Sequence, residues 1–371
     1  MQTNEFVHNA LRKYYDSHTV PAPPGIEQRE FGAGVDKKID WRHLSFANEQ
    51  QMNAYLRSSV PFYISYSAGY YEFPEGRPMQ KKNWLGADLV FDLDADEYET
   101  DCRHEKDQIC DTCMNRVKEE CIKLIEEFLV PDFGFSKGEL HVAFSGNRGY
   151  HIRVHREDVR ELSQNSRKEV IDYITGSGIR PGSYLRRTGK HLGGPRPSDW
   201  GWAGRVTAAM REEIAGGNEH SLARRMGVSL ATAKKILAKK ELVLKGIDEG
   251  DWDQVALDPK TWRRAFGLFS IELSAEIDKG VTMDVSRLLR LPHSIHGGTG
   301  FIACEVPRLD KFVYNRDPVV LGDEETKVKC LVGQDVVLKD KVFELEKEKH
   351  LMLPEYAAFY CAAKGLVKLW G

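Results

Sequence analysis

The sequence feature that most constrains the fold is GADLVFDLDADEYETD at residues 86–101, where an apolar run leads directly into acidic residues. Side chains along a β-strand alternate between two faces. A strand over 87–94 therefore puts Leu89, Phe91 and Leu93 on one face, and Val90 on the other face with Asp92 and Asp94. Two carboxylates this close repel each other unless a cation neutralises them, and they can bind the same divalent ions. The alternative is an acidic strand end in solvent, which suits Asp92 and Asp94 poorly because Leu93 lies between them.

The composition is that of a soluble globular protein, with 371 residues, 41% of them hydrophobic and 29% charged. That length suits one large domain or two ordinary ones. The first residues show no signal-peptide pattern, and no apolar run approaches the roughly 18 residues of a membrane span. We therefore expect a cytoplasmic protein with reduced thiols and no membrane association. The formal net charge of -3 does not indicate nucleic-acid binding, so such binding needs local basic patches.

Local patterns predict the secondary structure of much of the chain. Helical periodicity indicates helices, and alternation of apolar with polar residues indicates strands and hairpins. An aromatic-rich stretch reads as two strands joined by a turn. The predicted elements are helices over 6–17, 113–134 and 356–370, the strand–turn–strand over 61–74, a hairpin over 139–155 and a strand over 300–309.

The character of the chain changes between about residues 160 and 272, which hold helical runs but no convincing strand. A loop rich in Gly, Pro and Arg covers residues 176–205. We predict an α/β domain that is interrupted by a mostly helical insertion. The predicted boundaries are 1–175 for the first part of the α/β domain, 176–271 for the insertion and 272–371 for the second part.

A cluster of cysteines in CRHEKDQICDTC, residues 102–113, predicts a zinc site. Its donors are spaced C-x-H-x5-C-x2-C, and the C-x2-C half is the tight knuckle that wraps a tetrahedral ion. The alternative is a set of cysteines that happen to lie in a charged loop. Four protein ligands leave no open position, so we predict one structural Zn²⁺ in a small module at about 101–114. The predicted ligands are Cys102, His104, Cys110 and Cys113.

The hairpin predicted over residues 139–155 carries a second candidate site. Alternation places Ser145 and His151 across the mouth of the hairpin, with Arg148 on the turn between them. A hydroxyl, a guanidinium, an imidazole and the backbone amides of a Gly-rich turn can cradle a polyphosphate. Ser and His also occur in hydrolase pairs, but no G-x-S-x-G elbow supports that interpretation. An ordinary polar hairpin tip is the remaining alternative.

A third candidate site lies in EIDKGVTMDVSRLLRLPHSIHGGTG, residues 276–300. Asp278 precedes a short predicted helix that Pro292 stops. Arg290 and His296 follow, beside an obvious Gly-Gly turn. An acid and two cationic or hydrogen-bonding groups within twenty residues can complete a site for a metal and a phosphate. A solvated helix and loop would use the same residue types.

Together the three segments fit one chemistry. Two-metal phosphoryl or nucleotidyl transfer needs carboxylates that hold ions roughly 3.5–4 Å apart and cationic groups that hold the triphosphate. The metal ions activate a hydroxyl nucleophile and stabilise the pyrophosphate leaving group. We therefore interpret Asp92 and Asp94 as metal ligands.

On these motifs the chain resembles the catalytic small subunit of the archaeal and eukaryotic DNA primases, and most closely the archaeal members. DLVFDLD is similar to the family's first motif, SGNRGYH to its second, LLRLPHSIHGGTG to a later segment and QREF at 28–31 to an early one. The zinc module also lies between the first two motifs of the family. The resemblance implies mixed central β-sheets flanked by helices, whereas the helical insertion matches only in position and character.

The resemblance also implies roles for individual residues. Asp92, Asp94 and Asp278 match the acids that hold two Mg²⁺ or Mn²⁺ ions. The chain would then be a DNA primase catalytic subunit that joins nucleoside triphosphates on single-stranded DNA and extends the primer. A large subunit with an iron–sulfur domain is the implied partner. The implied nucleotide-binding residues are Arg29, Ser145, Arg148, His151, Arg290 and His296.

The segment LARRMGVSLATAKKIL, residues 222–237, is typical of a helix-turn-helix with Gly227 at its turn. It lies within residues 219–245, where seven Lys and Arg against two Glu give a local charge of +5. One interpretation is DNA binding, and the one we favour here is a packed helical pair. Two other functions stay open for the chain: a primase-related repair or mobile-element polymerase, and a helix-turn-helix DNA-binding regulator.

Overall fold

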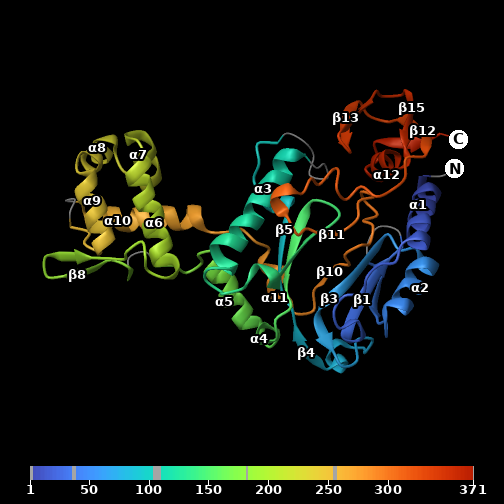
Figure 1. Ribbon diagram of the computed structural model, residues 1–371, viewed down its shortest axis with the longest axis horizontal. Helices are drawn as coiled ribbons and strands as arrows, with labels where there is room; N and C mark the ends of the chain where they lie inside the picture. The colour runs from blue at the N-terminus through green and yellow to red at the C-terminus, as the bar shows by residue number, and fades with distance from the viewer. Residues whose placement is uncertain (1–2, 36–38, 103–109, 181–182, 254–256, 371) are drawn as a thin grey trace. The chain divides into compact units, whose positions relative to one another are not determined.

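The chain divides into two compact units, each of which is described here by itself (Figure 1). The computed structural model describes residues 3–35, 39–102, 110–180, 183–253 and 257–370, and the predicted zinc ligand His104 lies outside them. Within these ranges, every helix is too short or too polar to span a bilayer. Unit 1 comprises residues 1–123, 135–169 and 277–371, and unit 2 comprises residues 124–134 and 170–276.

The larger sheet of unit 1 is antiparallel, with the strand order β10-β3-β1-β2 and β4 also paired with β3. Its longest strand, β3 (Tyr63–Tyr71), is continuous, so the predicted turn within 61–74 is wrong. Gly69 occupies this strand because a β-carbon there would lie 2.8 Å from the Val285 carbonyl oxygen. The other strands are β1 (Arg29–Gly34), β2 (Trp41–Leu44), β4 (Trp84–Ala87) and β10 (Leu288–Arg290).

The second sheet has the order β11-β6-β7-β5 and carries the acidic strand. The predicted hairpin is confirmed as β6 (Leu140–Phe144) and β7 (Gly149–Val154). β5 (Leu89–Asp94) pairs antiparallel with β7 along its whole length. Only the short strand β11 (Cys304–Glu305) forms where we predicted a strand over 300–309.

A small apolar cluster joins the two sheets. Its members are Ala68 of β3, Val90 of β5, Leu289 of β10 and Val281 of the short helix α11 (Lys279–Met283), all 4% exposed or less. β10 stands where we expected a helix before Pro292, because its residues pair with β3 at the sheet edge.

The remaining helices of unit 1 follow the sequence pattern more closely. α1 (Thr3–Ser17) is the predicted N-terminal helix, and α3 (Asp111–Lys123) begins the helix predicted from residue 113. The chain then enters unit 2 as a π-helical turn, η4 (Leu124–Leu129). Unit 1 also contains α2 (Glu49–Ser59) and α4 (Glu157–Arg160), and α5 (Gln164–Ile174) begins in unit 1 and ends in unit 2.

The C-terminal part of unit 1 is richer in strands than we expected. β12 (Glu325–Cys330) is the middle of a sheet with β15 (His350–Pro354) and β16 (Val367–Leu369). The predicted C-terminal helix is α12 (Glu355–Ala363), which ends before β16. A separate hairpin joins β13 (Gln334–Leu338) and β14 (Lys341–Leu345).

Unit 2 is mostly helical. Its core includes Trp252, Trp262 and Phe266, and the two indole rings meet edge to face at 4.9 Å. An unpredicted hairpin, β8 (Arg186–Thr188) and β9 (His191–Gly193), corrects the expectation of no strand here. The helices are α6 (Gly201–Gly216), α7 (Glu219–Met226), α8 (Leu230–Ala238), α9 (Lys240–Glu249) and α10 (Pro259–Leu273).

Candidate active site and cysteine cluster

Asp92 and Asp94 are the two partly exposed residues of β5, whose other residues are all buried. On the neighbouring strand β7, Asp92 pairs with His151 and Asp94 pairs with Gly149. Because paired residues point to the same face of a sheet, His151 shares a face with the two carboxylates. His151 Nε2 is 3.4 Å from Asp92 Oδ1. The alternation of the sequence thus places a carboxylate pair beside an imidazole.

Asp278 is brought to the same place from almost 190 residues further along the chain. Its backbone amide donates to the Asp92 carbonyl oxygen at 3.2 Å. Its side chain caps α11, with Oδ1 accepting from the amides of Gly280 at 2.7 Å and Val281 at 3.2 Å. Capping leaves the second carboxylate oxygen without a role in the helix end.

The carboxylates of this site are held in an environment that opposes their charge. Burial raises the pKa of Asp92 to about 6, and the charge of Asp278 adds to the increase. Burial also raises the pKa of Asp94. For Glu97, burial and the charges of Asp278, Asp92 and Asp94 raise the pKa to about 7. Grouped acids with raised pKa values are what a divalent cation would relieve, so the donors fit Mg²⁺ or Mn²⁺.

Arg148 lies on the hairpin turn and contacts the acids. Its Nε is 2.9 Å from Asp94 Oδ1, and its Nη2 contacts Asp96. Ser145 closes the same turn, since its hydroxyl accepts from the amides of Asn147 at 3.4 Å and Gly149 at 3.3 Å. The turn therefore presents a guanidinium next to the carboxylate pair.

The segment containing His296 packs directly on this turn. The Thr299 hydroxyl donates to the Gly146 carbonyl oxygen at 2.5 Å. Gly146 has a φ of +81°, and a β-carbon there would lie 2.9 Å from Cβ of His296. This close approach explains the glycine and joins two of the predicted phosphate-binding segments.

The two histidines of the site are neutral near pH 7. Burial and the charges of Arg153 and Arg290 lower the pKa of His151 to about 3. Burial and then Arg290 lower the pKa of His296 well below its usual value. His296 Nδ1 accepts from the Gly298 amide at 3.2 Å, so its proton is on Nε2. His296 can then donate one hydrogen bond to an anion.

Arg290 completes the cationic side of the site. Burial lowers its pKa to about 10, which leaves it charged near neutral pH. Its guanidinium lies over the ring of Tyr63, 4.5 Å from the centroid, and the same ring meets His296 edge-on at 5.1 Å. Its Nη1 is buried without a hydrogen-bond partner among the described residues. Such an orphaned donor fits an anionic ligand.

Arg29 is placed differently from the other predicted nucleotide ligands. Its side chain is fully buried, and Nη2 pairs with the equally buried Asp88 Oδ2 at 2.7 Å. Nη1 donates to the carbonyl oxygens of Ser67 at 2.9 Å and Ala68 at 2.8 Å, and the guanidinium lies 3.5 Å from the Tyr70 ring centroid. The hydrogen bonds of Arg29 therefore tie β1 to β3 and to Asp88, which links β4 to β5, and its contact with nucleotide stays a prediction.

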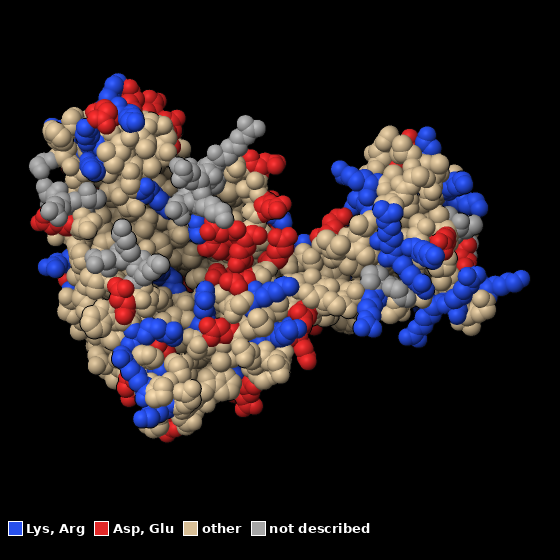
Figure 2. Space-filling view, turned by 180° about the vertical axis from the view of Figure 1, so that it is seen from behind, with Lys and Arg blue, Asp and Glu red and all other residues tan. Residues whose placement is uncertain are grey.

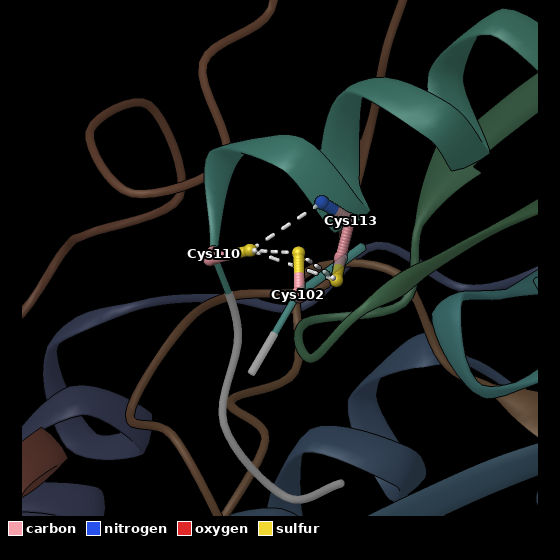
Figure 3. Close-up of side chains that lie close together, drawn as sticks. All are labelled: Cys102, Cys110 and Cys113. Carbon is pink, nitrogen blue, oxygen red and sulfur yellow. Dashed lines mark hydrogen bonds between the residues drawn. The ribbon is translucent and has the colours of Figure 1, made fainter. Parts of the chain in front are cut away.

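Three of the four predicted zinc ligands come together (Figure 3). Cys110 and Cys113 lie at the start of α3, and Cys102 approaches from the preceding loop. Their sulfur atoms are 3.3–3.6 Å apart, close to the ~3.8 Å of thiolates around a tetrahedral zinc ion. Burial raises the pKa of Cys113 to about 11, so its thiolate needs a nearby cation. A second group of possible metal ligands lies in unit 2: His191, Asp251 and Asp253.

Sequence reasoning missed three side chains around the site. Glu97 lies in the 3₁₀ turn η3 (Ala95–Glu97) directly after Asp94, and its exposed carboxylate is still close enough for the charges of Asp278 and Asp92 to act on it. Its position three residues after Asp94 is a signal that could have revealed it. Arg287 lowers the pKa of Asp92 through its charge. Tyr63 contacts both Arg290 and His296, and only the pairing of β3 with β10 could have revealed that.

Carboxylates grouped on a sheet face, with arginines and neutral histidines beside them, define the site of a phosphoryl- or nucleotidyl-transfer enzyme. The sequence model of the DNA primase small subunit matches residues 91–307. The chain belongs to the DNA primase small subunit family. The predicted function, a primer-synthesising nucleotidyltransferase, is thereby confirmed.

Archaeal relatives extend this match over nearly the whole chain. The DNA primase small subunit PriS of Methanothrix thermoacetophila is 34% identical, with 99% of each chain covered. The PriS proteins of Methanocella arvoryzae and Methanococcoides burtonii are 32% and 30% identical, with 98% of each chain covered. The predicted likeness to archaeal members is confirmed as well.

Proposed function

We propose that the enzyme uses two divalent ions, Mg²⁺ or Mn²⁺, held by Asp92, Asp94 and Asp278. The observation that carries this proposal is the backbone hydrogen bond of 3.2 Å from Asp278 to Asp92, which fixes the third acid beside the pair on β5. When bound, the ions supply charge neutralisation at the reacting phosphate and activation of a hydroxyl group. The raised pKa values of Asp92 and Glu97 support a cation at this position.

The triphosphate of the incoming nucleotide lies, in this proposal, against the turn of the β6–β7 hairpin and the segment that packs on it. Arg148 and Arg290 supply charge, and neutral His296 donates from Nε2. His151 stays next to Asp92 and orients it. Ser145 shapes the turn through its two amide hydrogen bonds. Arg29 supports this site from inside the fold through Asp88.

The reaction joins two nucleotides on a single-stranded DNA template. The 3′ hydroxyl oxygen of one nucleotide forms a bond to the α-phosphorus of the next, and the bond to the leaving pyrophosphate breaks. The residues of this chain hold both groups in line, which lowers the entropic part of the barrier. The positive charges of Arg148 and Arg290 stabilise the negative charge that develops on the leaving pyrophosphate.

The cysteine cluster belongs to a structural zinc site in this proposal, with His104 as the fourth ligand beyond the described residues. The sulfur separations support the three thiolates as its other ligands. A fully ligated ion stabilises the local fold and takes no part in the chemistry. A primase large subunit is the proposed protein partner, and residues 176–271 form the proposed insertion domain.

Primer synthesis on a single-stranded template that carries no primer tests the function directly. The proposal predicts short products that need nucleoside triphosphates and Mg²⁺ or Mn²⁺, and that disappear with chelator and return when the metal is restored. Extension of supplied primers without any synthesis on bare template would instead identify a gap-filling polymerase. The family match favours primer synthesis over that alternative and over a DNA-binding regulator.

A further inference from the structure

The helix-turn-helix predicted in the insertion forms in unit 2 as two helices with defined ends. α7 ends at Gly227, whose φ of 64° terminates the helix in the left-handed region. Ser229 then caps α8 by accepting from the Thr232 amide at 3.2 Å. Asn218 caps the start of α7 in the same way. The three-residue turn between two capped helices fixes the angle between them.

The inner faces of the two helices are packed, whereas the outer face of α8 is open to solvent. Leu222 and Met226 of α7 and Ala233 and Ile236 of α8 are fully buried. The exposed residues of α8 recur at helical spacing and so form one stripe. This stripe consists of Leu230, Ala231, Lys234, Lys235 and Ala238.

Cations surround this open face. Arg224, Lys235 and Lys239 are exposed and have no ion pair within the part of the chain that the structure describes. Lys234 lies 3.5 Å from Glu219, and because the two side chains are 62% and 40% exposed, water screens that pair. Figure 2 shows Lys and Arg over much of the visible face of unit 2, with fewer acidic residues among them.

Lys240 differs from its neighbours, because its ammonium group donates to the Ala215 carbonyl oxygen. It therefore belongs to the packing of unit 2 and not to the open surface. Glu241 is the remaining acid of the basic segment and is exposed. The structure thus separates surface lysines from a structural one within a run that looks uniform in sequence.

We propose that the outer face of α8 binds the phosphate backbone of double-stranded DNA. The small side chains of Ala231 and Ala238 allow α8 to approach a DNA groove closely. Lys234, Lys235 and Lys239 lie beside these alanines and can contact the phosphates. The B-form major groove admits a helix, whereas the A-form major groove is too narrow. α7 and α8 carry no Phe, Tyr or Trp on which unpaired bases could stack, which favours duplex over single strand.

The test uses the full-length chain and a fluorescent DNA duplex of random sequence, with anisotropy measured as salt is varied. Lys234→Gln, Lys235→Gln and Lys239→Gln together remove three charges from the face. Ala231→Glu puts a carboxylate on the stripe at a position where glutamate suits the first turn of a helix. The control replaces three exposed lysines of unit 1 with glutamine: Lys341, Lys347 and Lys349.

The proposal predicts that the triple variant binds duplex at least about tenfold more weakly at 0.1 M salt, with a log–log salt slope smaller by up to about 3. Ala231→Glu should weaken duplex binding while circular dichroism stays unchanged, and the control variant should bind like the parent chain.

Parent-like binding by both test variants would overturn the proposal, and so would an equal loss in the control. A loss for single-stranded DNA equal to that for duplex would overturn the assignment to duplex. A changed oligomeric state with unchanged DNA binding would assign the face to a second copy of the chain. Primer synthesis is not read in this experiment, so its outcome is separate from that of the proposed mechanism.

Discussion

Arg148, on the turn of the β6–β7 hairpin, contacts Asp94 at the end of β5, with Nε 2.9 Å from Oδ1. In the proposed mechanism these residues bind ligands of opposite charge, because Asp94 binds a metal ion and Arg148 binds the triphosphate. A metal ion at Asp94 and the Arg148 guanidinium carry like charges and repel each other, so they compete for this carboxylate oxygen. A metal ion that binds Asp94 therefore frees Arg148 for the triphosphate, and a nucleotide that binds Arg148 frees Asp94 for the metal ion.

This competition predicts that Arg148→Ala binds Mn²⁺ more tightly than the parent chain when no nucleotide is present. Loss of the neighbouring cation removes a charge that opposes the ion, and we expect a gain of about threefold to tenfold. Titration followed by the electron paramagnetic resonance of free Mn²⁺ measures this directly. Arg156→Ala removes a partly exposed arginine that pairs with Asp158 and is the matched control. Weaker Mn²⁺ binding by Arg148→Ala would contradict the competition.

Nucleotide binding should change in the opposite direction. Loss of a charged hydrogen bond to phosphate costs about 1.5–3 kcal/mol, so Arg148→Ala and Arg290→Ala should raise the nucleotide requirement about tenfold to a hundredfold. We expect formation of the first bond to suffer more than extension, because initiation holds two free nucleotides whereas a paired primer already fixes one side. The measurement is a nucleotide titration with and without a supplied primer. Equal defects in both would remove the special role in initiation, and no defect would remove these arginines from the triphosphate site.

The cysteine cluster predicts about one zinc ion per chain. Cys110→Ser should lose that ion and lower the melting temperature, because binding energy in such a module is folding energy. Metal analysis of protein purified without chelator measures the content, and Cys361→Ser is the control for zinc content because Cys361 does not belong to the cluster. A parent chain without zinc would end the proposal of a structural site.

The raised pKa of Asp92 predicts how stability depends on pH without added metal. The unfolded carboxyl titrates near its usual 3.8 and the folded one at about 6, so the folded state binds more protons between these values. Asp92 therefore stabilises the fold below about pH 4, and that contribution is lost as the pH rises through 6. Asp92→Asn should be more stable than the parent chain at pH 7 by roughly 2–3 kcal/mol.

Chemical unfolding of both chains from pH 4 to pH 7, in chelator, checks this prediction. The difference between the two chains should grow with pH, and Mg²⁺ should reduce it by stabilising the parent chain alone. Parallel stability curves at all pH values would show that Asp92 is not held against its charge.

The parts of this structure that the sequence predicted well depend on local alternation. The β6–β7 hairpin and the shared face of Asp92 and Asp94 follow from side chains that alternate along one strand. The turn predicted within residues 61–74 was wrong because β3 continues through Gly69, where the glycine allows close packing against Val285. β10 was missed because its pairing with β3 is a tertiary contact between segments far apart in the chain.

The candidate site divides in the same way. Its motifs were visible, but the pairing of Arg29 with Asp88 joins residues 59 positions apart and could not be read from either segment. The contact between Tyr63 and Arg290 depends on the pairing of β3 with β10, two strands that are far apart in the sequence. The position of Glu97 near the acids could have been predicted from local sequence, because only the 3₁₀ turn η3 separates it from Asp94.

The most direct test of the proposed mechanism is the yield of primers on unprimed single-stranded DNA from Asp92→Asn and from Asp94→Asn. Each change keeps the side-chain volume and removes the charge that binds metal, and Asp323→Asn is the control because Asp323 is an exposed acid outside the site. We predict that both site variants fold like the parent chain and make no primers at saturating nucleotide and Mn²⁺, while the control retains full yield. Near-normal primer yield from either site variant would contradict the assignment of the two metal ions to this strand.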